Sequence, residues 1–138
     1  MKLKEIMTRD VEVVQPDDTL QEAAKKMRMR DVGFLPVCDG QKLVGALSDR
    51  DITVWAAADG KDPKKTQVKD LVHSRVCWCY EDQTVDESAK MMTEQEIRRV
   101  MVIGREDKQL VGVVSLGDLA TRVSSKTSGN VLVKVGPH

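Results

Sequence analysis

The sequence has few aromatic residues and no excess of either charge. Aromatic residues make up 3% of its 138 residues, and 22 basic side chains balance 22 acidic ones. A chain without net charge exerts no general attraction on nucleic acid or on an anionic membrane. We therefore expect no membrane partner and disfavour a nucleic-acid partner, and any anion must be bound through local geometry.

Long apolar stretches are also missing. No run approaches the roughly 20 residues that span a bilayer. The start, Met1 to Glu5, lacks the apolar centre of a signal peptide. Three cysteines are an odd number without a disulfide pattern, which suits a reducing compartment. These features predict a cytoplasmic protein.

Residues typical of metal and catalytic sites are scarce. Cys77 and Cys79, with His73 nearby, fall short of the four ligands that a structural zinc ion takes. The sequence has no Gly-x-Ser-x-Gly, no His-Glu-x-x-His and no phosphate-binding Gly-x-x-x-x-Gly-Lys. We therefore expect no bound metal, no required cofactor and no enzymatic activity.

The main feature of the chain is an internal repeat. Residues 43–52 return as residues 110–119, and residues 17–27 return as residues 82–92. The second copy has gained residues only in its polar turn, as a true repeat should. The predicted organisation is a first repeat over 1–60, a polar linker over 61–67, a second repeat over 68–123, and a polar connector with a strand-like tail over 124–138.

Both copies have the same predicted order of elements, which is strand, helix, strand, strand, helix. In the first copy these elements are a strand over 11–14, a helix that begins at 19, strands over 32–38 and 43–47, and a helix over 51–58. In the second copy they cover residues 76–80, 84–93, 100–103, 110–114 and 116–123. A copy of about 60 residues buries too little surface to fold comfortably alone, so we expect the two copies to pack together. Their order of strands and helices predicts an α+β fold. Its two β-α-β-β-α repeats pack sheet to sheet about a pseudo-twofold axis.

In each copy the last strand runs directly into a helix. Ser48 and Asp51 mark this junction in the first copy, and Ser115 and Asp118 mark it in the second. Ser followed three residues later by an acid is the pattern of a capping box. Helix starts attract anions, and a carboxylate can accept two hydrogen bonds from ribose hydroxyls. Two interpretations stand, a ligand site and a simple helix cap.

The repeated junctions and the strand Val32-Gly33-Phe34-Leu35-Pro36-Val37 give the chain a family resemblance. It resembles a pair of cystathionine beta-synthase (CBS) domains, the arrangement called a Bateman module. The resemblance implies a non-catalytic regulatory module that binds adenosine-containing ligands in clefts between the repeats. The expected ligands are AMP, ADP, ATP or S-adenosylmethionine. It also implies a homodimer, in which we expect the apolar helix faces around Leu20, Met27, Met91 and Met92 to be buried.

The resemblance also assigns roles to individual residues. Asp51 and Asp118 would hold ribose, and Ser48 and Ser115 would lie at the phosphate or ribose edge. Arg98 and Arg99 would close the Asp51 site around a phosphate. Gly33 and Phe34 would lie near the Asp118 site, with Arg50 reaching across. The remaining expected contacts come from Pro36, on a lining strand, and from small apolar residues against adenine, Val11, Val13 and Val76.

Other interpretations remain open for several of these residues. Arg98 and Arg99 also fit a solvated pair bound to Glu94 or Glu96. Trp55 and Trp78 are expected to pack in a core or an interface, since large aromatic side chains usually do. For the whole chain, the alternative function is a structural homodimerisation module with vestigial ligand clefts. An RNA-end binder is the least favoured function, because the net charge is zero.

Overall fold

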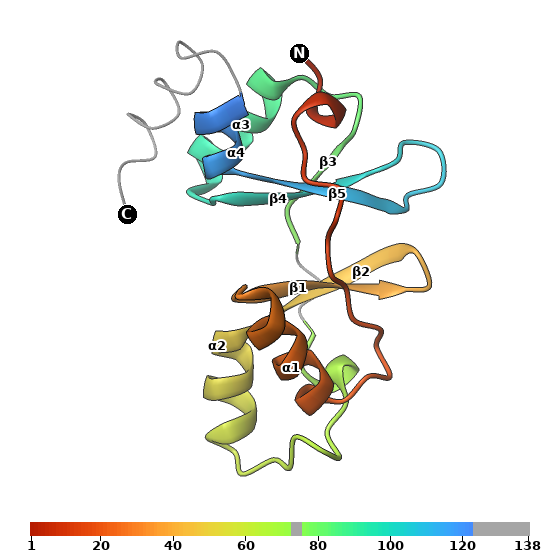
Figure 1. Cartoon of the computed structure of the whole chain (residues 1–138), viewed down its shortest axis with the longest axis vertical. Helices are drawn as coiled ribbons and strands as arrows, with labels where there is room; N and C mark the ends of the chain where they lie inside the picture. Colours follow the sequence, from red (N-terminus) through yellow and green to blue (C-terminus); the bar gives the residue numbers. More distant parts are fainter. Residues whose placement is uncertain (73–75, 123–138) are drawn as a thin grey trace. The chain divides into compact units, whose positions relative to one another are not determined.

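A computed structural model describes residues 1–72 and 76–122 of the chain. It divides into two compact units, which are treated separately below. The first-repeat unit comprises Glu12–Val76, and the second-repeat unit comprises Met1–Val11 together with the chain from Cys77 onward. Figure 1 shows the elements of both units. The predicted helix end at Val123, the tail over 124–138 and His73 lie outside the described residues.

The first-repeat unit contains a two-stranded antiparallel sheet and its helices. Its elements are α1 (Leu20–Arg30), β1 (Phe34–Asp39), β2 (Lys42–Ser48), α2 (Asp49–Asp51), the π-helical η2 (Ile52–Ala57) and the 3₁₀-helical η3 (Val68–Asp70). The predicted hairpin is confirmed, and Gly40 takes a φ of 65° in its turn. The predicted strand over 11–14 is wrong, because only Val14 forms a bridge, with Val37 of β1.

The second-repeat unit contains a three-stranded sheet in the order β3-β4-β5. Its elements are η1 (Leu3–Glu5), β3 (Trp78–Tyr80), α3 (Val85–Gln95), β4 (Arg99–Ile103), β5 (Leu110–Ser115) and α4 (Leu116–Arg122). Strand β4 pairs parallel with β3 and antiparallel with β5. The α+β class with two related repeats is confirmed.

The first long helix of each repeat begins and ends in the same way. Thr19 and Glu22 form a capping box at α1, and Thr84 and Glu87 form one at α3. Each helix ends at a residue in the left-handed conformation, Asp31 with φ 54° and Glu96 with φ 53°. The predicted N-termini of both helices are therefore confirmed by the cap geometry itself.

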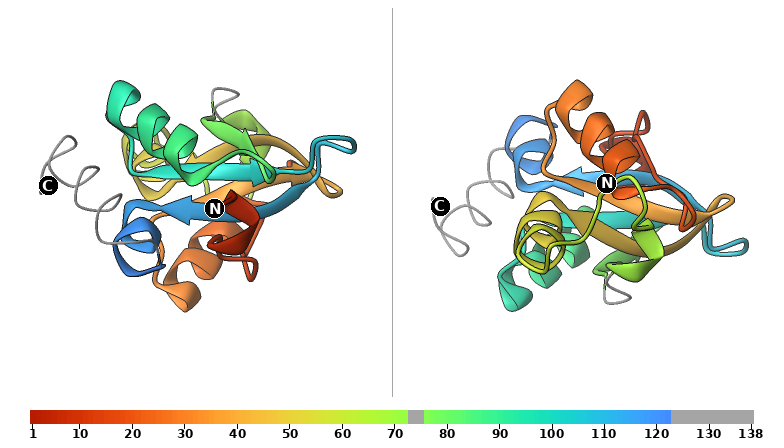
Figure 2. Two further views of the ribbon diagram at one scale, coloured as in Figure 1. Left: turned by 90° about the horizontal axis from the view of Figure 1, so that it is seen from above. Right: turned by 90° about the horizontal axis from the view of Figure 1, so that it is seen from below.

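The segment that precedes each repeat packs on the body of the other one. Leu3 of η1 is fully buried in the second-repeat core, and Val68 of η3 is fully buried in the first-repeat core. The Leu3 N–H donates to Gln83 C=O at 2.9 Å, and the Val68 N–H donates to Asp18 C=O at 2.7 Å. Figures 1 and 2 show the red N-terminal segment beside β5. Each unit is thus completed by residues that precede the other repeat.

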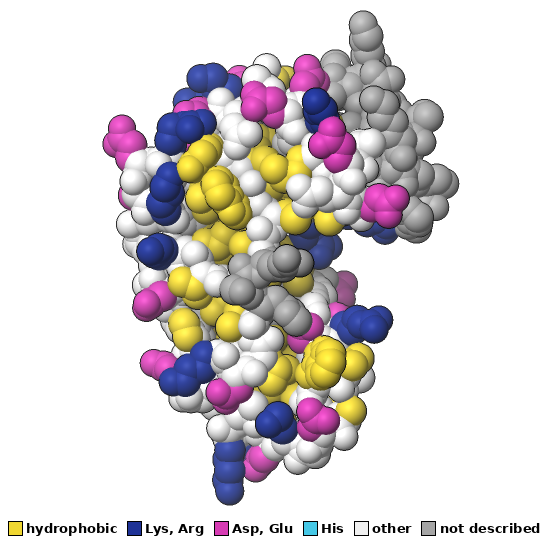
Figure 3. Space-filling view, turned by 180° about the vertical axis from the view of Figure 1, so that it is seen from behind, with side chains coloured by type: hydrophobic (Ala, Val, Ile, Leu, Met, Phe, Trp, Pro, Cys, Tyr) yellow, Lys and Arg dark blue, Asp and Glu magenta, His cyan; other side chains and the backbone are white. Residues whose placement is uncertain are grey.

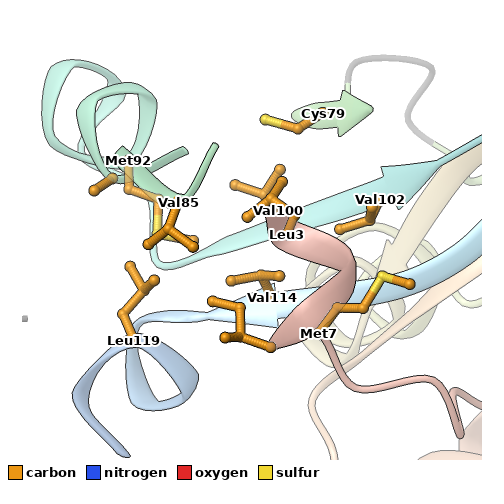
Figure 4. Packing of buried hydrophobic residues seen from close by; sticks show 11 residues of the cluster. Leu3, Met7, Cys79, Val85, Met92, Val100, Val102, Val114 and Leu119 are labelled. Atoms are coloured by element: carbon orange, nitrogen blue, oxygen red, sulfur yellow. The ribbon is translucent and has the colours of Figure 1, made fainter. Parts of the chain in front are cut away.

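Each unit has its own hydrophobic core, and the cores contain residues that were expected on an outer face. Leu20 and Met92 are fully buried and Met27 is 6% exposed, so the prediction that these helix faces lie outside the fold is wrong. Figure 4 shows Met92 packed with Val85, Val100 and Leu119. Their burial within each unit means that they do not form a dimer surface.

The surface carries both charges and some large apolar side chains. On the face in Figure 3, basic and acidic side chains are interspersed, so neither sign dominates there. Trp55 is 58% exposed and Trp78 is 41% exposed, so neither packs into a core. Within residues 1–72 and 76–122, none of the helices has the length and hydropathy needed to span a bilayer.

Candidate functional site

Strand β2 passes directly into α2 at Ser48, which has extended backbone angles. The Ser48 N–H donates to Asp51 Oδ2 at 2.8 Å, and the Asp51 N–H donates to Ser48 Oγ at 3.0 Å. Asp51 is 8% exposed, which is unusual for a carboxylate and is tolerated here because the backbone N–H satisfies it. The predicted capping box at this junction is confirmed.

The junction between β5 and α4 repeats this geometry. The Ser115 N–H donates to Asp118 Oδ2 at 2.9 Å, and the Asp118 N–H donates to Ser115 Oγ at 3.1 Å. A carboxylate has two oxygens and about four lone-pair sites, so a cap uses only part of its accepting capacity. The same reciprocal cap is present at both junctions, Ser48–Asp51 and Ser115–Asp118.

The start of the preceding strand lies beside each junction. In the first-repeat unit, Phe34 pairs with Ser48, and the Asp49 N–H donates to Gly33 C=O at 2.9 Å. Arg50, at the same junction, is exposed, and its backbone N–H donates to Asp49 Oδ1 at 2.8 Å. The structure therefore brings Gly33, Phe34 and Arg50 to the Asp51 junction.

In the second-repeat unit the corresponding neighbours are basic. Arg99 pairs with Ser115, and the Leu116 N–H donates to Arg98 C=O at 2.9 Å. Both arginine side chains are exposed. Partial desolvation lowers the pKa of Arg99, which nevertheless stays protonated at neutral pH. The backbone of Arg98 and Arg99 therefore lies beside Ser115 and Leu116, at the junction capped by Asp118.

Asp49 is a site residue that the sequence reasoning missed. A Cβ added at Gly33 would stand 3.2 Å from Asp49 Oδ2, so glycine allows this carboxylate to approach the chain closely. The second repeat has Leu116 at the equivalent position. The sequence signal that could have identified Asp49 was an acid at the first position of the helix, where the helix dipole favours negative charge. The Asp51 junction is thus the more acidic, and the Asp118 junction is the more basic.

The other predicted site residues lie on or beside the strands. Pro36 is buried in β1, and its C=O accepts the Val14 N–H at 3.1 Å. Val13 is half-buried in the segment before that bridge, and Val11 and Val76 are half-buried as well. Val11 belongs to the second-repeat unit, whereas Val13 and Val76 belong to the first. Their proposed contact with adenine stays a prediction, as does closure of the Asp51 site by Arg98 and Arg99.

Metal ligands of the usual kinds do not converge in the part of the chain that the structure describes. Within residues 1–72 and 76–122, no group of three or more His, Cys, Asp or Glu side chains is arranged to hold a metal ion. The three cysteines are free thiols, with Cys38 and Cys79 buried and Cys77 half-buried.

Comparison with known proteins agrees with the repeated junctions. The CBS domain family model matches residues 3–57 and 68–125. The chain belongs to the CBS domain family. The family resemblance inferred from the sequence is therefore confirmed, and proteins of this family are generally regulatory modules.

Several small CBS proteins are similar over nearly their whole length. The chain is 33% identical over 134 residues to the CBS domain-containing protein YhcV of Bacillus subtilis, covering 96% of this chain and 94% of the relative. It is 36% identical over 118 residues to hypoxic response protein 1 of Mycobacterium tuberculosis, covering 85% of this chain and 81% of the relative.

Solved structures give the same result. The crystal structure of hypoxic response protein I, which holds two coordinated zinc ions, has a TM-score of 0.79 at 34% identity and covers 90% of this chain and 100% of that one. CBSX2 in complex with AMP has a TM-score of 0.72 at 23% identity and covers 86% of this chain and 93% of that one. At that identity the second likeness supports the fold alone.

Proposed function

We propose that this protein is a non-catalytic sensor that binds adenosine-containing ligands at its two strand-to-helix junctions. The supporting observation is the capping box that occurs twice, with Asp51 and Asp118 each held by a backbone N–H at the start of a helix. Ligand binding would be transmitted to a partner protein or to the chain's own dimer. The membership of the CBS domain family supports this choice of ligand class.

The proposed role of each site residue follows from the chemistry of its side chain. A carboxylate accepts from two vicinal hydroxyls at once, which makes Asp51 and Asp118 the proposed ribose ligands. Ser48 and Ser115 lie at the helix starts, where the helix dipole favours an anion. Arg98 and Arg99 supply guanidinium forks for phosphate oxygens. Val11, Val13 and Val76 are proposed to line the adenine position, and Pro36 is proposed to lie on a lining strand. Gly33 and Phe34 are proposed to lie near the Asp118 site, with Arg50 reaching across.

Calorimetric titration tests the proposal directly. We expect AMP, ADP, ATP or S-adenosylmethionine to release heat and to raise the melting temperature, since a ligand at 100 times its Kd adds about 2.7 kcal/mol to the stability. The variants Asp51→Asn and Asp118→Asn retain a capping acceptor but lose the charge, and they should bind more weakly. No heat and no thermal shift at millimolar ligand would support the structural homodimerisation module instead.

The chain offers a matched control for these variants. Glu22 forms the same reciprocal cap with Thr19 at the start of α1, at distances of 2.9 and 3.1 Å. Glu22→Gln therefore removes a charge from a capping box outside the two junctions. An equal loss of affinity in this variant would mean that the junction variants act through stability, and that the junctions do not bind the ligand.

A double-mutant cycle tests whether Arg99 binds the same ligand as Asp51 or as Asp118. Arg99→Gln is combined with Asp51→Asn and, separately, with Asp118→Asn, and ATP affinity is measured for each set. If Arg99 and Asp51 bind one ligand, their effects are coupled. Coupling with Asp118 alone would instead place the phosphate and the ribose at the junction to which Arg99 is paired through Ser115.

The proposal includes a homodimer, with an interface other than the helix faces first expected. Val54 and Trp55 on η2 remain 39% and 58% exposed, and large aromatic side chains are enriched in interfaces. Light scattering of wild type and of Trp55→Glu tests this interface. A dimer that survives the substitution unchanged would place the interface elsewhere.

A further inference from the structure

Two cysteines occupy alternate positions of one extended segment, with Cys79 inside β3 and Cys77 directly before it. Cys79 pairs with Val102 of β4, and the Cys77 C=O accepts the Met101 N–H at 2.9 Å, so the ladder includes both cysteines. Side chains two residues apart on a strand lie on the same face. Cys77 and Cys79 therefore point to one side of the sheet, and Trp78 points to the other.

Helix α3 presents a matching stripe of side chains to these thiols. Ser88, Met91 and Gln95 are spaced by three and four residues, so they lie on one helix face. The Cys79 Sγ lies 3.8 Å from Met91 Sδ, and the Cys77 thiol donates to Gln95 Oε1 at 3.1 Å. The Cys79 thiol thus contacts the Met91 thioether, and the Cys77 thiol contacts α3 four residues further along, at Gln95.

The inner end of this cluster contains an unsatisfied hydroxyl. Ser88 is fully buried, and among the described residues its Oγ has no hydrogen-bond partner of ordinary geometry. A thiolate at Cys79 would give the hydroxyl an acceptor, so the cluster has one polar group that a metal-bound sulfur would satisfy.

The sulfur spacing is that of a metal-sulfur centre. A three-coordinate ion with metal–sulfur bonds of about 2.3 Å holds its sulfurs about 4 Å apart. The Cys79–Met91 separation of 3.8 Å matches that spacing before any ion is bound. Figure 4 shows Cys79 extending from β3, and its side chain is fully buried in the core cluster. Cys77 and Met91 are half-buried, which leaves the cluster a route to solvent.

We propose that Cys77, Cys79 and Met91 bind a soft, thiophilic monovalent cation, with Cu(I) as its natural representative. Thiolate and thioether ligands select Cu(I), whereas a structural zinc ion takes four nitrogen, sulfur or carboxylate ligands. The site supplies two thiols and one thioether. On binding, both thiols lose their protons to solvent, so two protons are released for each cation. This site is separate from both helix junctions and does not depend on the function proposed above.

Competitive titration of the full chain under anaerobic, reducing conditions tests the site. Cu(I) is supplied as its bicinchoninate complex, and transfer is followed by loss of the chelate colour and by proton release in a weakly buffered solution. We expect one equivalent to be bound with two protons released. Cys77→Ser should weaken binding more than the roughly 10- to 100-fold that the loss of an outer-shell partner costs.

Three further measurements complete the test. Met91→Leu keeps the volume of the side chain and removes only the thioether, so it should weaken Cu(I) binding without altering the melting temperature. Cys38→Ser, which changes the buried thiol of the other unit, should leave binding unchanged. Zn²⁺ measured with a chromogenic zinc chelator should bind far more weakly.

The proposal is overturned by any of three results. The first is that wild type fails to compete with bicinchoninate. The second is that Cys77→Ser and Met91→Leu, both at half-buried positions, retain full binding. The third is that Cys38→Ser loses as much binding as Cys77→Ser. The test does not rely on a Cys79 variant, because substitution of that fully buried residue can unfold the unit.

Discussion

Thr8 and Val113 exchange two backbone hydrogen bonds, although they lie near opposite ends of the chain. The Thr8 N–H donates to Val113 C=O at 2.9 Å, and the Val113 N–H donates to Thr8 C=O at 3.0 Å. Met7, the residue before Thr8, is 5% exposed in the same core. The N-terminal segment is therefore an integral part of the second-repeat unit, and its contacts with β5 offer a direct test of this arrangement.

Gly112→Ala should destabilise the second-repeat unit by about 1–3 kcal/mol, the usual cost of overpacking. The added Cβ would stand 2.7 Å from Met7 Sδ and 2.9 Å from Thr8 C=O. Urea unfolding of wild type and variant measures the effect. Gly117→Ala is the control, because its nearest contact is Ser115 Oγ at 3.5 Å and alanine favours a helix. If Gly112→Ala is as stable as wild type, the segment does not dock on β5 in solution.

The serine caps should contribute measurably to stability. Ser48→Ala and Ser115→Ala each leave an N–H without its side-chain acceptor, and each should cost about 1 kcal/mol. Ser48→Thr, which keeps a hydroxyl, should cost less. Chemical unfolding without ligand gives these values. A loss confined to ligand affinity, with unchanged stability, would contradict the capping role of the two hydroxyls.

Glycine at the ends of the long helices should stabilise the protein. Asp31 and Glu96 both have positive φ, a conformation that costs non-glycine residues roughly 1–2 kcal/mol. Glu96→Gly and Asp31→Gly should each raise the free energy of unfolding by up to about 1 kcal/mol, although glycine also loses more entropy on folding. Glu94→Gly, inside α3, should instead lower it. Equal losses for Glu94→Gly and Glu96→Gly would show that helix α3 ends later in solution.

The buried Cys38 thiol should make the protein sensitive to alkaline pH. Burial raises the pKa of Cys38 to about 11, whereas an exposed thiol has a pKa of about 8.5. Because the folded state holds this proton more tightly, the contribution of Cys38 to stability is complete below the unfolded pKa. It is lost as the pH rises from there through the folded value.

Two measurements check the behaviour of this thiol. At pH 8 a thiol reagent should modify the half-buried Cys77 well before Cys38, which is 2% exposed. Cys38→Ala should flatten the loss of stability above the exposed-thiol pKa, with Cys77→Ala as the matched control. The same alkaline slope in wild type and in Cys38→Ala would assign the titration to another group.

Arg105 should hold Asp82 in its ionised form at low pH. Two guanidinium nitrogens bind the carboxylate, with Nε 2.8 Å from Oδ2 and Nη2 2.9 Å from Oδ1. The hydrogen bonds from Arg105 lower the pKa of Asp82. The contribution of this pair is therefore present above the ordinary carboxyl pKa and is lost as the pH falls through the lower, folded value.

Carboxyl NMR titration of wild type and of Arg105→Gln measures this effect. The pKa of Asp82 should return toward its ordinary value in Arg105→Gln and should stay low in the control Arg98→Gln. An unchanged Asp82 pKa without Arg105 would mean that the ion pair does not form in solution.

The elements that were predicted correctly are those determined by interactions between residues close to one another in the sequence. The caps at Thr19, Ser48, Thr84 and Ser115 were readable because a side chain bonds a backbone N–H three residues away. The hairpin turn at Gly40 was readable because glycine readily takes the positive φ that the turn requires. The strand predicted over 11–14 was wrong. Its valines suggest a strand, but within this segment the bridge at Val14 is not extended into a pairing with another strand.

Sequence by itself determined that the chain is a repeat, where its helices begin, and that an acid stands at each of two helix starts. These properties follow from hydrogen bonds and side-chain periods that span only a few residues. Tertiary structure decided that Leu3 completes the core of the second-repeat unit and that Val68 completes the core of the first. It also decided that Arg99 pairs with Ser115 and that the Cys79 sulfur meets Met91. Such contacts join residues distant in sequence, and their partners are chosen by packing, which no short stretch of the chain encodes alone.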